Sequence, residues 1–213
     1  MASFIVFEGG EGSGKSTQAR SLYRKLKQQG IPALLTHEPG GTPQGRRIRH
    51  LLKGEGEINP LAELLLFAAS RAQLMADVIR PALKKGMMVI SDRHADSTRA
   101  YQGYGRGLDM ATIEAINDMA TGGLHPDLII LLDMGAESGL ARKGSAPGDR
   151  FEREEIGFHQ RVREGYLKLA QADPGRWLVV DGALPRRKVT AIIWKRVSEL
   201  LSKEIPREAL AKA

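Results

Sequence analysis

The stretch Gly9-Gly10-Glu11-Gly12-Ser13-Gly14-Lys15-Ser16 decides the fold, because it matches the pattern G-x-x-x-x-G-K-[ST] at every defined position. It follows the apolar run Phe4 to Phe7 and opens an amphipathic segment, so it has the strand, loop and helix context that the pattern requires. A glycine-rich turn that merely starts a helix is the alternative. The complete match after a buried strand favours a phosphate-binding loop, the P-loop.

This loop predicts how a nucleoside triphosphate is held. Glycines let the chain wrap closely, so that backbone N–H groups and the helix N-terminus point at phosphate oxygens. Lys15 is expected to reach the β- and γ-phosphates, and the Ser16 hydroxyl is placed to bind Mg²⁺, with Thr17 completing the ATP site. The motif identifies a nucleotide-binding fold and leaves the reaction open, because motors, switches and kinases share it.

Alternation of short apolar runs with amphipathic stretches predicts an α/β fold of three layers, in which helices flank a five-stranded parallel sheet. The expected strands are Phe4 to Phe7, Ala33 to Thr36, Met87 to Ser91, Leu128 to Asp133 and Trp177 to Asp181. The expected helices are Lys15 to Gln29, Pro60 to Lys85, Asp109 to Thr121, Arg153 to Ala172 and Pro185 to Ser202. We predict one domain over residues 1–213, with fraying at 203–213.

Composition narrows the class of protein. The 213 residues include no cysteine, which excludes disulfides and thiolate metal sites, and no apolar run approaches the roughly 18 residues of a membrane span. We therefore expect a cytoplasmic protein without a membrane partner. The net charge of +7 fits nucleic-acid binding, but it fits equally a site that gathers several phosphates carried by small molecules.

Further motifs on the acceptor side carry a resemblance. The motifs, in chain order, are Glu38-Pro39-Gly40-Gly41-Thr42, Phe67-Ala68-Ala69-Ser70-Arg71, Asp92-Arg93-His94, Ala100-Tyr101-Gln102-Gly103 and Asp149-Arg150-Phe151-Glu152. Together with the P-loop, they closely resemble bacterial thymidylate kinases over about residues 3–200. The resemblance implies a homodimeric enzyme that uses ATP and Mg²⁺ to phosphorylate thymidine monophosphate (dTMP).

The resemblance also implies which residues hold the acceptor. Phe67 would stack on the base and Arg71 would bind the thymine edge, with Ser97 and Gln102 nearby and Tyr101 beside the deoxyribose. Arg49 and Arg93 would clamp the acceptor phosphate, because two guanidinium groups offer forked donors. Phe67 and Tyr101 could instead be core residues.

Two acidic positions and one segment complete the implied site. Asp92, at the end of the third strand, would hold Mg²⁺-bound water or orient Arg93, although it could instead cap a helix. The Glu11 carboxylate should repel a triphosphate beside it unless it faces the acceptor instead. The resemblance places Glu11 near the acceptor sugar. The P-loop then lacks an arginine of its own. The resemblance implies that a lid at about 142–152 supplies the basic residue that meets the transferring phosphate. The candidates are Arg142, Lys143 and Arg150, and we favour Arg142 and Arg150. A solvated loop is the alternative for this glycine- and proline-containing segment.

The predicted reaction is in-line attack by the acceptor phosphate on the γ-phosphorus, with no phosphoenzyme. Two alternatives stay open. Another nucleoside monophosphate kinase or a deoxynucleoside kinase would keep the P-loop and change the pocket. A nucleic-acid-associated P-loop ATPase is the third candidate, although no aromatic-interleaved nucleic-acid motif is visible, so a nucleic-acid partner is not expected.

Overall fold

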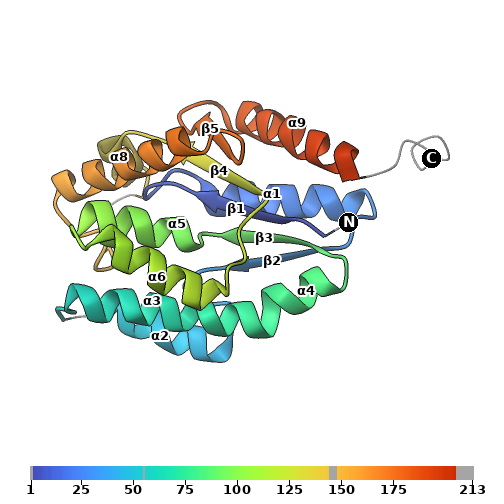
Figure 1. Cartoon of the computed structure of the whole chain (residues 1–213). Coiled ribbons are helices and arrows are strands. Elements are labelled where there is room, and N and C mark those ends of the chain that lie inside the picture. Colours follow the sequence, from blue (N-terminus) through green and yellow to red (C-terminus); the bar gives the residue numbers. More distant parts are fainter. Residues whose placement is uncertain (1, 55, 144–147, 205–213) are drawn as a thin grey trace.

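A computed structural model describes residues 2–54, 56–143 and 148–204 (Figure 1). Five strands form one sheet in the order β2-β3-β1-β4-β5, and every neighbouring pair is parallel. The strands are β1 (Phe4–Glu8), β2 (Ala33–His37), β3 (Met88–Asp92), β4 (Leu128–Asp133) and β5 (Trp177–Asp181). The predicted five-stranded parallel sheet is confirmed, with β3 running one residue later than expected because Asp92 pairs in register with both Phe7 and His37.

Helices connect the strands. They are α1 (Lys15–Gln28), α2 (Pro43–Lys53), α3 (Pro60–Leu74), α4 (Arg80–Lys84), α5 (Ala95–Thr98), α6 (Met110–Thr121), α7 (Ala136–Ala141), α8 (Ile156–Ala172) and α9 (Arg186–Glu204), with π-helical turns η1 (Met75–Ile79) and η2 (Arg99–Gly105). The predicted long helix from Pro60 is therefore interrupted by η1. The prediction missed α2, α5, η2 and α7, because these elements are short or rich in polar residues and glycine.

Two apolar layers enclose the sheet. On one face, Leu22 and Leu26 of α1 and Ile193 and Val197 of α9 pack against strand residues such as Ile130. On the other face, α3, η1 and α4 cover the β1 and β3 end of the sheet, and η2 and α8 cover the β4 end. Helices α2 and α6 in turn pack on α3, which places them at the periphery of that layer (Figure 1).

All five strands end at the same edge of the sheet, and this edge collects polar side chains. Glu8, His37, Asp92, Asp133 and Asp181 are the last residues of the five strands. In open parallel sheets, ligands bind in the crevice outside the carboxyl ends of the strands. We therefore expect the functional site in the crevice between β1 and β3.

The C-terminal boundary differs from the prediction. Helix α9 runs two residues past the predicted end at Ser202, to Glu204, and the fraying of 203–213 stays a prediction. The remainder of the predicted frayed tail, 205–213, lies outside the described residues, as does part of the predicted lid, 144–147. Within the described ranges, no helix combines the length and the apolarity that crossing a membrane requires.

Candidate active site

The loop between β1 and α1 is shaped by its glycines. Gly9, Gly12 and Gly14 have φ angles of 141°, 66° and 95°, a region that favours glycine. The loop also lies against α7, since a Cβ atom added to Gly12 would stand 1.8 Å from the Gly139 carbonyl oxygen. Backbone conformation and close approach together leave room only for glycine at position 12.

Lys15 and Ser16 open α1 at the floor of the loop. The Lys15 Nζ donates to the Gly10 carbonyl at 2.6 Å, and burial, with Arg93 nearby, lowers the pKa of Lys15 to about 8. The Ser16 hydroxyl donates to the Asp92 carboxylate across the β1–β3 crevice. Asp92 therefore does not cap a helix, because α5 begins after His94. A hydroxyl and a carboxylate oxygen stand side by side, which are the hard ligands that Mg²⁺ prefers.

Arg93 joins the loop to the opposite wall of the crevice. Its φ of 75° is unusual for a residue with a side chain, and its guanidinium donates to Glu11 at 2.6 Å and to Tyr101 at 3.0 Å. Burial alone would raise the pKa of Glu11, but Arg93, Lys15 and Lys143 hold it well below its usual range. Glu11 is thus an ionised group turned toward Arg93 and Tyr101, and its position near the acceptor sugar stays a prediction.

Glu8 supports this arrangement from below. It is fully buried, and its carboxylate accepts hydrogen bonds from the Ser97 hydroxyl at 2.6 Å, the Tyr166 hydroxyl at 2.8 Å and the His94 backbone N–H at 2.9 Å. Burial and the neighbouring Asp96 raise the pKa of Glu8 to about 7. The Ser97 hydroxyl is therefore held by Glu8, directly beneath the loop.

A cavity of about 630 Å³ runs from the P-loop to the wall formed by α2, α3 and η2. Fourteen of the predicted site residues line it: Glu11, Gly12, Gly14, Lys15, Ser16, Thr17, Arg49, Phe67, Asp92, Arg93, Ser97, Tyr101, Gln102 and Lys143. Gly9, Gly10, Ser13, Arg71, Arg142 and Arg150 do not. Phe67 and Tyr101 also pack against the core beneath α8, so each of them is both a core residue and a residue of the cavity wall.

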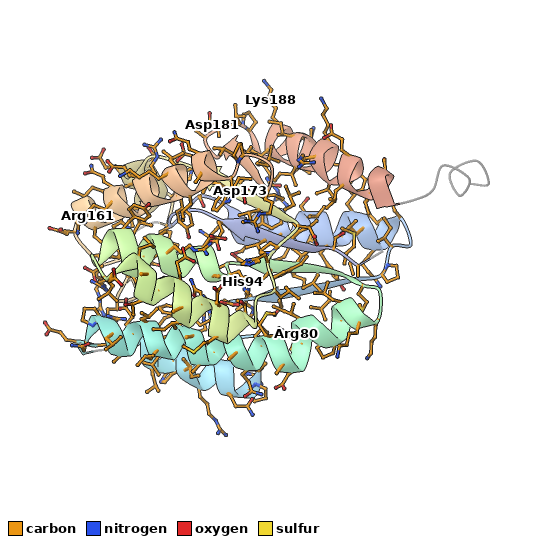
Figure 2. All side chains as sticks on the ribbon, viewed as in Figure 1. Arg80, His94, Arg161, Asp173, Asp181 and Lys188 are labelled. Atoms are coloured by element: carbon orange, nitrogen blue, oxygen red, sulfur yellow. The ribbon has the colours of Figure 1, made fainter. Side chains whose placement is uncertain are left out.

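Arg71 lies beneath the cavity. Its side chain is 1% exposed and donates to Glu38 at 2.8 Å, Asn117 at 2.6 Å and Thr98 at 2.9 Å. A further donor reaches the carbonyl of His94, a residue that Figure 2 shows in the interior, whereas Arg161 and Lys188 point outward. Four of its five N–H groups thus bond within the protein. Because most of its donors are already bonded, Arg71 supports the floor of the pocket, and the predicted contact with thymine stays a prediction.

The basic residues of the predicted lid lie in three different places. Arg142 donates to the Gly182 carbonyl at 2.9 Å, in the loop after β5. Arg150 contacts the Glu63 carboxylate at 2.5 Å, in the acceptor-side wall. Lys143 lies nearest the P-loop, with its Nζ 3.1 Å from Glu11. Of the three candidates, Lys143 is the one that lines the cavity.

Several residues of the site have no sequence motif of their own. Lys53 at the end of α2 forms an ion pair with Asp149, and the buried Glu63 joins Gln102, Arg106 and Arg150. Phe151 packs on Phe67 with ring centroids 5.8 Å apart. Only the quoted stretch Asp149 to Glu152 signalled part of this group. The partners come from separate helices and from the loop before α8, and a single sequence does not pair these segments.

Comparison with known proteins places the chain in a family. A family model described as thymidylate kinase matches residues 7–193. A thymidylate kinase of Dehalococcoides mccartyi (strain ATCC BAA-2266) is 56% identical over 94% of this chain and 98% of that protein, and one of Thermomicrobium roseum is 48% identical over 95% and 98%. The crystal structure of thymidylate kinase from Ehrlichia chaffeensis superposes with a TM-score of 0.77 at 33% identity, covering 92% of this chain and 98% of that one.

Proposed function

The chain belongs to the thymidylate kinase family, and from that premise we propose how it phosphorylates dTMP with ATP in the synthesis of dTTP for DNA. The observation that carries the proposal is Arg93, which reaches from the end of β3 to Glu11 in the P-loop and to Tyr101 in the opposite wall. One cationic group thereby faces both the P-loop and the pocket for the acceptor. ATP occupies the P-loop side, and dTMP occupies the side lined by Phe67 and Gln102.

The reaction is a direct in-line transfer. An oxygen of the acceptor phosphate attacks the γ-phosphorus of ATP, and the bond from that phosphorus to the oxygen of the β-phosphate breaks, leaving ADP. Arg49 and Arg93, which both line the cavity, clamp the acceptor phosphate, and Lys15 holds the β- and γ-phosphates. A phosphate monoester is already mostly ionised near neutral pH, with a second pKa of about 6, so no general base is needed.

Ser16 and Asp92 are the residues that would hold Mg²⁺. Their side-chain oxygens meet at the mouth of the P-loop, and among the described residues no cluster of three or more acidic, histidine or cysteine side chains offers a protein-only cation site. When bound, Mg²⁺ would offset the negative charge of the transferring phosphate.

The acceptor pocket distributes recognition over several groups. Phe67 stacks on the base, and Tyr101 and Glu11 face the sugar, since both line the cavity and the Tyr101 hydroxyl donates to Glu11 at 2.9 Å. Gln102 and Ser97 line the wall on either side of Tyr101. Stacking contributes affinity but little discrimination between bases, because every base has a π-face. The polar side chains therefore set specificity.

An acceptor-by-acceptor assay of ADP formation tests the proposal. Purified protein with MgATP should form ADP rapidly with dTMP, more slowly with the monophosphates of deoxyuridine and deoxycytidine, and negligibly with thymidine. Phosphorylation of thymidine in place of dTMP would make the protein a deoxynucleoside kinase. Tight, salt-sensitive DNA binding without acceptor-dependent ADP formation would make it a nucleic-acid-associated ATPase.

We also infer a cytoplasmic homodimer. Leu51 of α2, Leu61 and Leu65 of α3 and Met119 of α6 are between 48% and 76% exposed. Their helices pack side by side, α2 on α3 and α3 on α6, so the apolar side chains occupy one layer of the fold. Sedimentation should give a mass of about two chains, and Leu65→Glu should shift the protein toward monomer. A wild-type protein that sediments as a single chain would contradict the inference.

A further inference from the structure

Glu63 is a buried carboxylate at the acceptor wall that the reaction itself does not use. It lies in the first turn of α3 and is 0% exposed. Its Oε1 accepts from the Gln102 Nε2 at 2.7 Å, and its Oε2 lies 2.5 Å from the Arg150 guanidinium. Arg106 donates to both oxygens at 3.3 Å. One carboxylate thus gathers side chains from η2, from the residue that follows it and from the loop before α8.

The two arginines determine what Glu63 can do. Guanidinium groups can only donate, so the Glu63 oxygens that face Arg106 and Arg150 act as acceptors toward both. A carboxylate oxygen that accepts in this way has no hydrogen to donate. Glu63 therefore presents acceptor atoms alone to Gln102.

This restriction fixes the orientation of the Gln102 amide. The amide has a donor end and an acceptor end, and only the NH₂ group can satisfy Glu63. Gln102 is 1% exposed, lines the cavity beside Tyr101, and its Oε1 makes no hydrogen bond to the residues that the structure describes. The carbonyl oxygen is left as the polar atom that Gln102 offers to a ligand in the cavity.

An outward carbonyl oxygen selects among pyrimidine bases. Thymine and uracil carry a hydrogen on N3 and can donate to this oxygen, whereas cytosine has a lone pair on N3 and would set acceptor against acceptor. Sites built to bond one pattern reject the opposite one strongly, because buried polar groups are then left unpaired. We propose that Glu63 is a positioning residue that fixes the Gln102 amide with its oxygen toward the acceptor base and so selects nucleotides with a hydrogen on N3. This inference rests on the proposed function.

Glu63→Gln tests the proposal. The new side chain is nearly the same size but can accept or donate, so the Gln102 amide becomes free to turn. We expect the ratio of kcat/KM for dTMP to that for deoxycytidine monophosphate to fall at least tenfold. KM for dTMP should rise with little change in kcat or in KM for ATP. The preference for dTMP over deoxyuridine monophosphate should be unchanged, since both bases carry the N3 hydrogen, and a merely structural role would not separate these two ratios.

Glu154→Gln is the matched control. Glu154 pairs with Arg106 in the same cluster at 2.6 Å and has no contact with Gln102, so its variant should keep the wild-type ratio. Gln102→Met provides the second variant, and it should lose the same discrimination. In the double variant Glu63→Gln with Gln102→Met, no further loss is expected, because the two residues act through one contact.

The outcomes separate the inference from the proposed function. A wild-type protein that forms no ADP with dTMP would remove the proposed function. If the wild type is active and either Glu63→Gln or Gln102→Met keeps the full preference over deoxycytidine monophosphate, the role of Glu63 is overturned. Should Glu63→Gln fail to fold by its thermal unfolding, Gln102→Met decides alone.

Discussion

The P-loop and the acceptor wall are two halves of one cavity that are built in opposite ways. The P-loop, residues 9–16, is contiguous in sequence and owes its shape to backbone angles and to glycines pressed against α7. The acceptor wall is drawn from α2, α3, η2 and the loop before α8, and ion pairs such as Lys53 with Asp149 and Glu63 with Arg150 connect these segments. Backbone conformation therefore shapes the half that holds ATP, the donor half, and side-chain pairing shapes the half that holds the acceptor, the acceptor half.

The largest effect should come from the donor half and should not depend on the acceptor. Lys15→Ala removes the ammonium at the floor of the P-loop, where charge develops during transfer. We expect kcat/KM to fall about 100- to 1,000-fold with every nucleotide accepted. Lys27→Ala, an exposed residue on the same helix, is the control and should match the wild type. If Lys15→Ala lowered kcat/KM by different factors for thymine and cytosine nucleotides, the donor half would not act independently of the acceptor half.

The same division explains what the sequence could predict. The P-loop motif and four of the five strand starts followed from local patterns, because each depends on residues close in sequence. The contact of Ser16 with Asp92 joins two residues, 76 positions apart, that the sequence assigned to Mg²⁺ separately. Arg142 and Arg150 were the favoured partners of the transferring phosphate, yet the structure brings Lys143 to Glu11 and ties the two arginines to Gly182 and Glu63.

Long-range side-chain pairing accounts for the differences. Four of the N–H groups of Arg71 bond to Glu38, Asn117, Thr98 and a backbone carbonyl, and these partners come together only after four segments have packed. Glu63 looked like an ordinary residue of a helix first turn, where acidic side chains are common. No spacing rule in a single sequence connects Glu63 to Gln102, 39 positions later.

The second prediction concerns the stacking surface of the acceptor half. Phe67→Leu keeps an apolar side chain against Phe151 but removes the aromatic face. Stacking contributes about 1–3 kcal/mol per base, so KM should rise about tenfold for thymine, uracil and cytosine nucleotides alike. KM for ATP should stay the same, which serves as the internal control. A rise confined to thymine nucleotides would show that Phe67 reads the base and does not merely support it.

The third prediction tests which lid residue serves the transfer. Lys143 lies beside Glu11 with a side chain 37% exposed, so its charge is partly screened by solvent. We expect Lys143→Ala to lower kcat about fivefold, equivalent to about 1 kcal/mol. Arg142→Ala, which loses a contact with Gly182, should change kcat less. Rapid-quench measurement of one turnover distinguishes the two, and the reverse order would return the role to Arg142.

The smallest effect, as measured at pH 8, is a pH dependence of the donor half. Burial lowers the pKa of Lys15 to about 8, so the free enzyme loses this ammonium as the pH rises through 8. Because kcat/KM reports groups of the free enzyme, kcat/KM for ATP should fall about twofold at pH 8 and about tenfold per unit above it. The bound triphosphate favours the charged amine, so kcat at saturating ATP should lack this limb. Lys15→Arg, whose side chain stays charged, should abolish the limb in kcat/KM, and a limb that persists in this variant would assign the titration to another group.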